Sequence, residues 1–171
     1  TEKVSESTRK PPVLFQLTSL QKEANSRYGM SARRTLQAAQ RLYEGHKVLT
    51  YPRTDSSALP NDYRSKVDEL IAALAGGSAD QGSFAEEQRS EAITEAAKQL
   101  QKDGLKNTGR HFDDSKVGDH FAIIPTGNWP ATPLGGDDAK IFELVLRRFL
   151  AVFLAPSRWQ KVVRESVVQI Q

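Results

Sequence analysis

Apolar side chains recur every three to four residues along several stretches of the chain, which is the spacing of a helix with one buried face. This pattern predicts helices over residues 18–28 and 32–44, from about Pro60 to Gly76-Gly77, over 83–102 and over 138–155. The last stretch is apolar nearly all round, so we expect it to be a buried central helix.

Capping residues mark the ends of the first two predicted helices. Thr18 followed by Gln21 is typical of a capping box, and Gly29 is placed to end that helix in the left-handed conformation. Ser31 is the expected cap of the second helix, which Gly45 ends. Two helices joined by a short turn, the second with a basic face, match a helix-turn-helix. An ordinary antiparallel helix pair with a solvated side gives the same pattern.

The remaining chain is expected to be extended or irregular. Residues 47–51 and 121–124 are short apolar segments, each followed by a proline, and we expect both to be extended. The valine-rich residues 159–171 predict a strand. Residues 1–12 are a polar, extended entry, whereas 103–119 and 128–136 are expected to be loops.

Composition narrows the classes of function. Cysteine is absent, which excludes disulfides, cysteine-ligated zinc, iron–sulfur clusters and thiol catalysis. No apolar run approaches the roughly 20 residues of a membrane-spanning helix, so we expect no membrane partner. The 24 Lys and Arg residues only slightly outnumber the 21 Asp and Glu residues, an excess for which nucleic acid is one of several explanations.

The segment Leu49-Thr-Tyr-Pro-Arg-Thr-Asp-Ser56 is the first candidate for chemistry. Side chains two apart on an extended chain point the same way, so Tyr51 and Arg53 are expected to face one side. A phenol can attack phosphorus, and a guanidinium can neutralise the phosphate. Tyrosine needs a base or a lowered pKa, because its usual pKa is about 10, and no base is evident here. A plain strand-to-loop turn remains the simpler interpretation.

The second candidate is His120, which precedes the apolar run Phe121 to Ile124. Anchored beside a core, this imidazole could contact a phosphate or transfer a proton. A lone loop histidine more often does neither. His46 and His111 have no surroundings in the sequence that suggest a function.

Together these segments resemble the type IA DNA topoisomerases. The stretch around Tyr51-Pro-Arg53 is similar to that family's active-site tyrosine motif, and His120-Phe-Ala-Ile-Ile-Pro-Thr126 is similar to its later histidine motif. The helices between Leu17 and Tyr43 also match, in the same order. Pro52 and Ile124 resemble the topoisomerase III branch more than the topoisomerase I branch.

The resemblance implies a fold and a reaction. The fold is mainly α: a helical, winged-helix (catabolite-activator-like) domain with short β segments, flanked by partial strands of an adjoining β-rich domain. Tyr51 would cleave single-stranded DNA through a 5′-phosphotyrosine intermediate and reseal it without ATP. Arg53 would hold the scissile phosphate and His120 a neighbouring one. Further DNA contacts are expected from a set on the second helix and both motifs: Arg33, Arg34, Lys47, Thr54 and Thr126.

The sequence also departs from the family pattern. The family binds Mg²⁺ through acidic residues of a Toprim domain, and neither that pattern nor the zinc-binding tails occur here; Asp113-Asp114 and Asp137-Asp138 are expected to be turn or helix-cap acids. We therefore expect no metal site in this chain, and we expect Mg²⁺ and the remaining topoisomerase domains in a longer enzyme. The implied division is 1–17 as an extended segment of the adjoining domain, 18–156 as the tyrosine-bearing domain, and 157–171 as the start of the β-rich domain.

Two alternatives stay open beside the enzyme. The chain could be a non-catalytic helix-turn-helix-type module that binds nucleic acid, or an interaction domain whose basic face is only solvated. The expected partner of the enzyme is single-stranded DNA, and the expected location is the cytoplasm, in association with the nucleoid. We expect the chain alone to be inactive in DNA relaxation.

Overall fold

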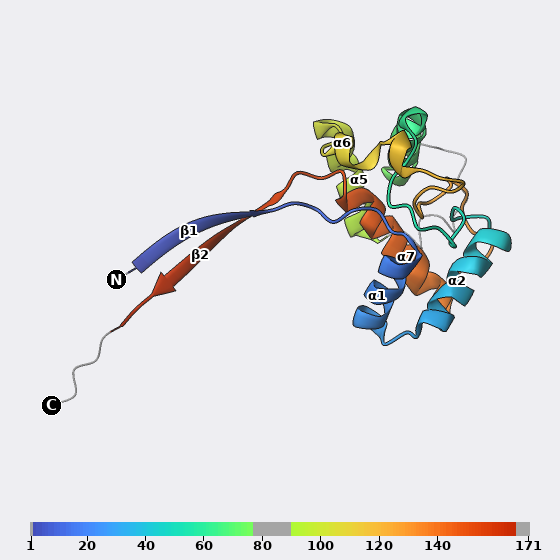
Figure 1. The fold of residues 1–171 in the computed structure, drawn as a ribbon, viewed down its shortest axis with the longest axis horizontal. Helices are drawn as coiled ribbons and strands as arrows, with labels where there is room; N and C mark the ends of the chain where they lie inside the picture. Colours follow the sequence, from blue (N-terminus) through green and yellow to red (C-terminus); the bar gives the residue numbers. More distant parts are fainter. Residues whose placement is uncertain (1, 77–89, 167–171) are drawn as a thin grey trace.

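A helical body and a long two-stranded ribbon that projects from it make up the chain (Figure 1). We describe them from a computed structural model, which covers residues 2–76 and 90–166. The helices are α1 (Leu17–Tyr28), α2 (Ala32–Glu44), α3 (Arg64–Leu74), α5 (Glu91–Asp103), α6 (Thr108–His111) and α7 (Gly136–Ala151). The strands are β1 (Glu2–Arg9) and β2 (Ser157–Arg164). This content confirms the prediction of a mainly α fold.

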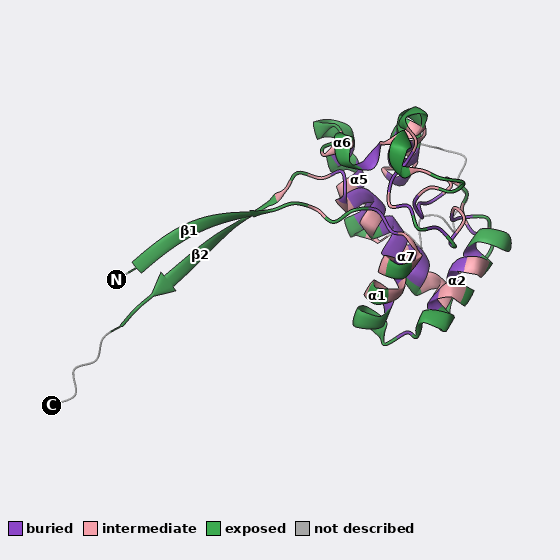
Figure 2. Cartoon of the chain, viewed as in Figure 1, coloured by how far each residue is buried: buried purple, intermediate pink, exposed green. Residues whose placement is uncertain are grey.

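Helix α7 runs through the middle of the helical body, as its all-round apolar sequence predicts. Helices α2 and α5 pack directly against it, α1 packs on α2, and α3 packs on α5. The buried residues lie on the faces that these helices turn toward one another (Figure 2). Seven residues of α7 are buried: Ile141, Phe142, Leu144, Val145, Leu146, Phe149 and Leu150. Because burying each large apolar side chain contributes about 1.5–3 kcal/mol, α7 organises the core.

The predicted helix ends are partly right. Helix α1 begins one residue earlier than expected, because the side chain of Gln16 accepts from the Thr18 N–H and Ser19 Oγ accepts from the Gln16 N–H. The predicted Thr18–Gln21 capping box is therefore wrong, and Gln21 Nε2 instead donates to the Ala32 carbonyl at 3.1 Å. Gly29 ends α1 in the left-handed conformation, at φ 63°, as predicted.

Ser31 caps α2, as expected, by accepting from the Arg34 N–H. Other elements differ from the prediction. The predicted loop 103–119 contains the short helix α6 and a 3₁₀ turn, Asp114–Lys116. A 3₁₀ turn, Asn61–Tyr63, precedes α3, whose predicted apolar face is buried. Of the predicted helix 83–102, residues 83–89 lie outside the described residues, and the rest belongs to α5.

The ribbon pairs β1 with β2 in antiparallel register, from Glu2 opposite Arg164 to Arg9 opposite Ser157. Every residue of both strands is exposed, including Val4 and Trp159. The strand expected over 159–171 is thus β2, while residues 167–171 lie outside the described part. Within residues 2–76 and 90–166, no helix has the length and apolarity needed to cross a bilayer.

His111 in α6 is buried, and its ring packs edge-on against Phe153 at 5.4 Å. Burial, with a smaller contribution from the positive charge of Arg110, lowers its pKa from the usual 6.5 to about 4. The unfolded chain therefore binds a proton at this residue in a pH range where the folded chain does not.

We predict that the free energy of unfolding falls by about 2 kcal/mol between pH 7.5 and pH 5, because protonation of His111 in the unfolded state begins near pH 6.5 and favours unfolding. Urea denaturation at the two pH values measures this loss. His111→Leu should remove most of the pH dependence, and equal slopes for the two proteins would show that the loss arises elsewhere.

Candidate active site

The two motif segments lie side by side, although they are far apart in the sequence. The Thr50 N–H donates to the Ile124 carbonyl, and the Thr126 N–H donates to the Val48 carbonyl, each at 3.0 Å. Leu49 and Pro125 form the antiparallel bridge between these bonds. The segment that ends at Tyr51 is therefore paired with the segment that follows His120.

The Thr50 side chain makes this pairing tighter. Its hydroxyl donates to the Ala122 carbonyl at 2.9 Å and accepts from the Ile124 N–H at 2.9 Å. A second layer of bonds holds the histidine segment, because the Ile123 N–H donates to the Phe15 carbonyl and the Ala122 N–H to the Ala58 carbonyl. The residue before Tyr51 thus fixes the backbone of the segment that carries His120.

Tyr51 lies in a row of three rings. Its ring is 4.0 Å from the His120 ring, centroid to centroid, with the planes inclined by 31°. The Tyr43 ring of α2 meets it nearly edge-on, at 5.4 Å and 79°. Tyr51 is half-buried, while His120 is exposed. The structure therefore brings two of the three predicted catalytic residues into contact and leaves them outside the sealed core.

Arg53 lies with His120 in a hollow of about 600 Å³, which we call the Arg53 hollow. Residues from three segments line it: Gln16, Leu17, Thr18, Arg53, Thr54, Asp55, Gly118, Asp119 and His120. Arg53 is exposed and forms no ion pair within the described residues. Its charge is free for a ligand, although Asp55 and Asp119 line the same hollow.

A second hollow, of about 520 Å³, opens beside Tyr43. We call it the Lys47 hollow; its lining is Tyr43, Glu44, Lys47, Leu49, Thr126 and Asn128. Lys47 has a left-handed backbone, at φ 57°, and its carbonyl accepts from Thr126 Oγ1 at 2.8 Å and from Asn128 Nδ2 at 3.0 Å. Two of the predicted DNA-binding residues, Lys47 and Thr126, are thus joined directly.

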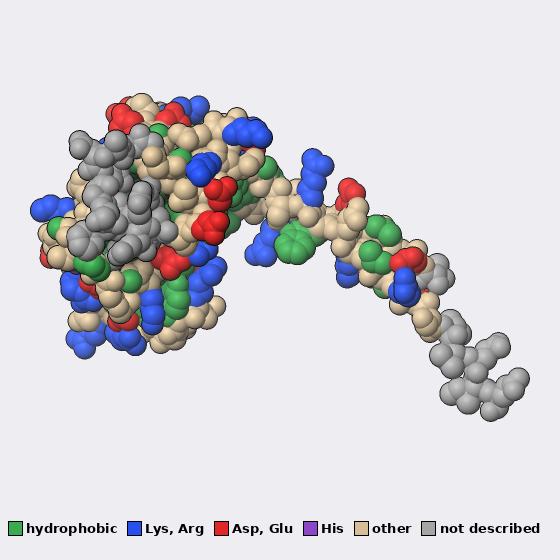
Figure 3. Space-filling model, turned by 180° about the vertical axis from the view of Figure 1, so that it is seen from behind, with side chains coloured by type: hydrophobic (Ala, Val, Ile, Leu, Met, Phe, Trp, Pro, Cys, Tyr) green, Lys and Arg blue, Asp and Glu red, His purple; other side chains and the backbone are tan. Residues whose placement is uncertain are grey.

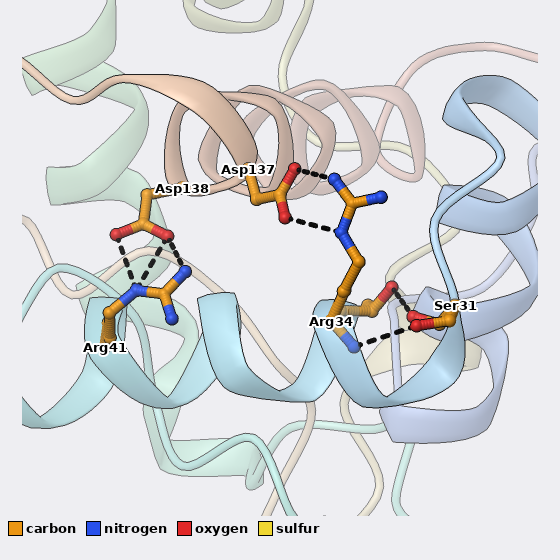
Figure 4. A network of polar contacts seen from close by, with 6 residues as sticks. Ser31, Arg34, Arg41, Asp137 and Asp138 are labelled. Carbon is orange, nitrogen blue, oxygen red and sulfur yellow. Dashed lines mark hydrogen bonds and ion pairs between the residues drawn. The ribbon is translucent and has the colours of Figure 1, made fainter.

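The other three predicted DNA-binding residues have different surroundings. Arg33 is exposed and has no ion-pair partner in the described part of the chain. The guanidinium of Arg34 forms a two-pronged ion pair with Asp137, with N–O distances of 3.0 and 2.8 Å (Figure 4). Thr54 is buried, and its hydroxyl accepts from the Ser56 N–H. Only Arg33 of these presents an unpaired cation.

The ion pair of Arg34 is one of two that join α2 to the first turn of α7. Arg41, seven residues after Arg34 on the same face of α2, pairs with Asp138 at 2.6 Å (Figure 4). The hydrogen bond from Arg34 also lowers the pKa of the Asp137 carboxyl below its usual value. Both acids lie at the N-terminus of α7, where negative charge is favourable. The sequence predicts turn or helix-cap acids here; the two acids lie in the first turn of α7, after the N-cap Gly135, and no sequence pattern identifies their partners.

A metal ion does not fit the residues that the structure describes. Within 2–76 and 90–166, no three His, Asp or Glu side chains lie close enough together to hold one. No chemical step proposed below therefore passes through a metal bound to these residues.

The comparisons with known proteins all point to one family. The family model described as DNA topoisomerase matches residues 1–170. The DNA topoisomerase 3 of Shouchella clausii (strain KSM-K16) is 41% identical over 149 residues, which are 86% of this chain and 18% of that protein. The DNA topoisomerase 3 of Bacillus subtilis (strain 168) is 34% identical over 157 residues, 90% of this chain and 20% of that protein.

A solved structure is also similar. Full-length topoisomerase I from Thermotoga maritima superimposes with a TM-score of 0.57 and 26% identity, over 95% of this chain and 24% of that one. The chain spans about a fifth of the length of the curated relatives it matches.

We predict that Thr50→Val lowers the free energy of unfolding by about 1–3 kcal/mol, because it keeps the shape of the side chain but leaves buried backbone groups without their hydroxyl partner. Chemical denaturation measures the change. Thr50→Ser is the matched control, since it keeps the hydroxyl. Equal stability of the two variants would mean that the hydroxyl does not hold the two segments together.

Proposed function

The chain belongs to the DNA topoisomerase family, and from this premise we propose that it carries the active-site tyrosine of a type IA enzyme of the topoisomerase III branch. The single observation that supports this most strongly is the contact between Tyr51 and His120 beside the Arg53 hollow. The half-buried phenol contacts the imidazole there, and the imidazole lines the same hollow as the free guanidinium.

The proposed reaction is an exchange of phosphodiester bonds. The Tyr51 hydroxyl attacks a phosphorus atom of single-stranded DNA, the bond to the 3′ oxygen breaks, and a 5′-phosphotyrosine forms. The departing strand takes a proton and keeps a free 3′-hydroxyl, while another strand passes through the gap. The hydroxyl then attacks the phosphotyrosine and restores the original bond. The number and type of bonds are conserved, so resealing needs no ATP.

Arg53 and His120 have separate roles in this proposal. The Arg53 guanidinium neutralises the scissile phosphate and the charge that builds up on it in the transition state. His120, whose ring lies tilted against the Tyr51 ring, holds the phenol in place and contacts a neighbouring phosphate. Thr54 contributes through its carbonyl, which accepts from the Leu17 N–H at 3.0 Å and so fixes the turn after Arg53 at the start of α1.

The chain would work together with a metal ion and with further domains. Mg²⁺ and the other domains belong, in this proposal, to the remaining four fifths of an enzyme of the relatives' length, which acts in the cytoplasm on the nucleoid. The α1–α2 pair with the paired segments near Tyr51 would form the winged-helix part of the fold. On the side shown in Figure 3, Lys and Arg side chains surround the helical body and follow the ribbon, with acids between them.

We predict that the full-length enzyme carrying this chain forms a covalent adduct with an end-labelled single-stranded oligonucleotide, and that Tyr51→Phe abolishes it. Arg53→Ala should reduce the adduct by about 100-fold or more, because it removes transition-state stabilisation, and should change the free energy of unfolding little. Denaturing gel electrophoresis measures the adduct. Tyr28→Phe is the matched control and should behave as wild type.

Three results would contradict this proposal. An adduct that survives Tyr51→Phe would place the nucleophile elsewhere. A loss of more than roughly 2 kcal/mol of stability in Arg53→Ala would make Arg53 a structural residue. Binding of the oligonucleotide without any adduct, in the presence of Mg²⁺, would instead favour the non-catalytic helix-turn-helix-type module.

We also predict that the neighbours Arg33 and Arg34 differ in role. Arg33→Ala should weaken binding of single-stranded DNA and reduce the log–log salt slope by about 0.7, as expected for the loss of one phosphate contact, without changing the thermal midpoint. Arg34→Ala should lower the thermal midpoint only slightly, because Asp137 loses its partner in an exposed ion pair. Fluorescence anisotropy and thermal unfolding measure the two effects, and identical behaviour of the variants would show that the Asp137 ion pair does not separate them.

A further inference from the structure

The Lys47 hollow carries an inference that rests on the proposed function and extends it. This hollow shares no lining residue with the Arg53 hollow, yet both adjoin the same row of rings. Tyr43 lines one hollow and His120 lines the other, and each contacts Tyr51. A strand whose scissile phosphate lies at Tyr51 and Arg53 therefore has a second depression available beside it.

The Tyr43 ring offers a surface for a base. It is 36% exposed at the last turn of α2, and it meets the Tyr51 ring nearly at a right angle. In an edge-on contact of this kind, ring surface stays uncovered. Base–aromatic stacking contributes about 1–3 kcal/mol per base and tolerates any sequence, since every base has a flat face.

Lys47 offers a cation in an unusual backbone position. A left-handed backbone costs free energy at a residue with a Cβ atom, and glycine or asparagine adopts it more readily. Here the carbonyl of Lys47 accepts two side-chain hydrogen bonds, which hold the conformation in place. A lysine at a position that favours glycine indicates that its side chain has a use. Within the described residues its ammonium group forms no ion pair, and it is exposed.

We propose that the Lys47 hollow binds one nucleotide of the single strand next to the scissile phosphate, with its base stacked on Tyr43 and its phosphate bound by Lys47. The volume of about 520 Å³ is ample for one nucleotide. Glu44 also lines the hollow, but its carboxylate accepts from Gln40 Nε2 at 2.6 Å. Its negative charge disfavours a second phosphate, so the hollow contributes one phosphate contact.

The first test uses the full-length enzyme and oligonucleotides in which a single abasic site is moved stepwise along both sides of the cut. With wild type, one position should lower the adduct yield by about 10-fold, because the base that stacks on Tyr43 is missing. Tyr43→Ala should lower the yield on the intact strand by a similar factor and lose its sensitivity at that position. Tyr28→Ala, at a tyrosine of equal exposure, should keep the wild-type profile.

This design separates stacking from an indirect effect. If Tyr43 only supported Tyr51, Tyr43→Ala would lower every yield alike and keep the dip at one position, which would overturn the proposal. Lys47→Gln should reduce the salt slope of binding by about 0.7. Lys22→Gln, on the exposed side of α1, is its matched control and should leave the slope unchanged.

The second test does not depend on cleavage. Titration of the 171-residue chain with oligothymidylate should shift the NMR signals of the Tyr43 ring and the Lys47 amide together. Shifts without any adduct in the full-length enzyme would sustain the subsite and refute the proposed reaction. An adduct dependent on Tyr51, with no shift at Tyr43 and no position-specific abasic effect, would sustain the reaction and refute the subsite.

Discussion

The antiparallel pairing of residues 47–50 with 122–126 is the constraint on which the site depends. It joins the tyrosine segment to the histidine segment through backbone bonds and the two bonds of the Thr50 hydroxyl. The apolar side chains of the same segments, Leu49, Ile123 and Ile124, are buried and anchor the pair to the core. Polar side chains next to these paired segments therefore stay at the surface, held in place by the buried residues of the same segments. A small domain can position reactive groups in this way.

The position of α2 is the second constraint, because α2 carries Tyr43 and leads into Lys47. Its buried residues pack on α7, and the ion pairs of Arg34 and Arg41 fix the exposed side against the first turn of α7. Exposed ion pairs of this kind contribute little to stability, but two of them spaced along a helix define its direction and register. Packing therefore supplies the free energy, while the charges select one orientation for the residues beside Tyr51.

The sequence predicts the parts of this arrangement that depend on local patterns. The apolar repeat identifies α7 and α3. The preference of glycine for the left-handed conformation places the end of α1 at Gly29. The capping box was misplaced because the Gln16 side chain accepts from the Thr18 N–H, the group expected to bond Gln21, and Ser19 Oγ accepts from the Gln16 N–H. The pairing through Thr50, the edge contact of Tyr43 and the acids opposite Arg34 join residues far apart in the chain, and no single-sequence pattern reports such contacts. The helical spacing at Tyr43 in the sequence is equally consistent with a side chain in the core.

The composition of the chain alone understates the positive charge of the surface beside Tyr51. The chain has a formal net charge of only +3, yet the structure sorts its cations into two classes. Arg34, Arg41, Arg147 and Arg148 are each paired with an acid, so they add little to the field that an approaching anion meets. In the described part of the chain, Arg33, Lys47 and Arg53 are exposed and unpaired, and the last two line the hollows beside Tyr51. Acids thus offset the charge of Arg34 and Arg41 between α2 and α7, whereas Lys47 and Arg53 keep their charge beside Tyr51, where the proposed strand would lie.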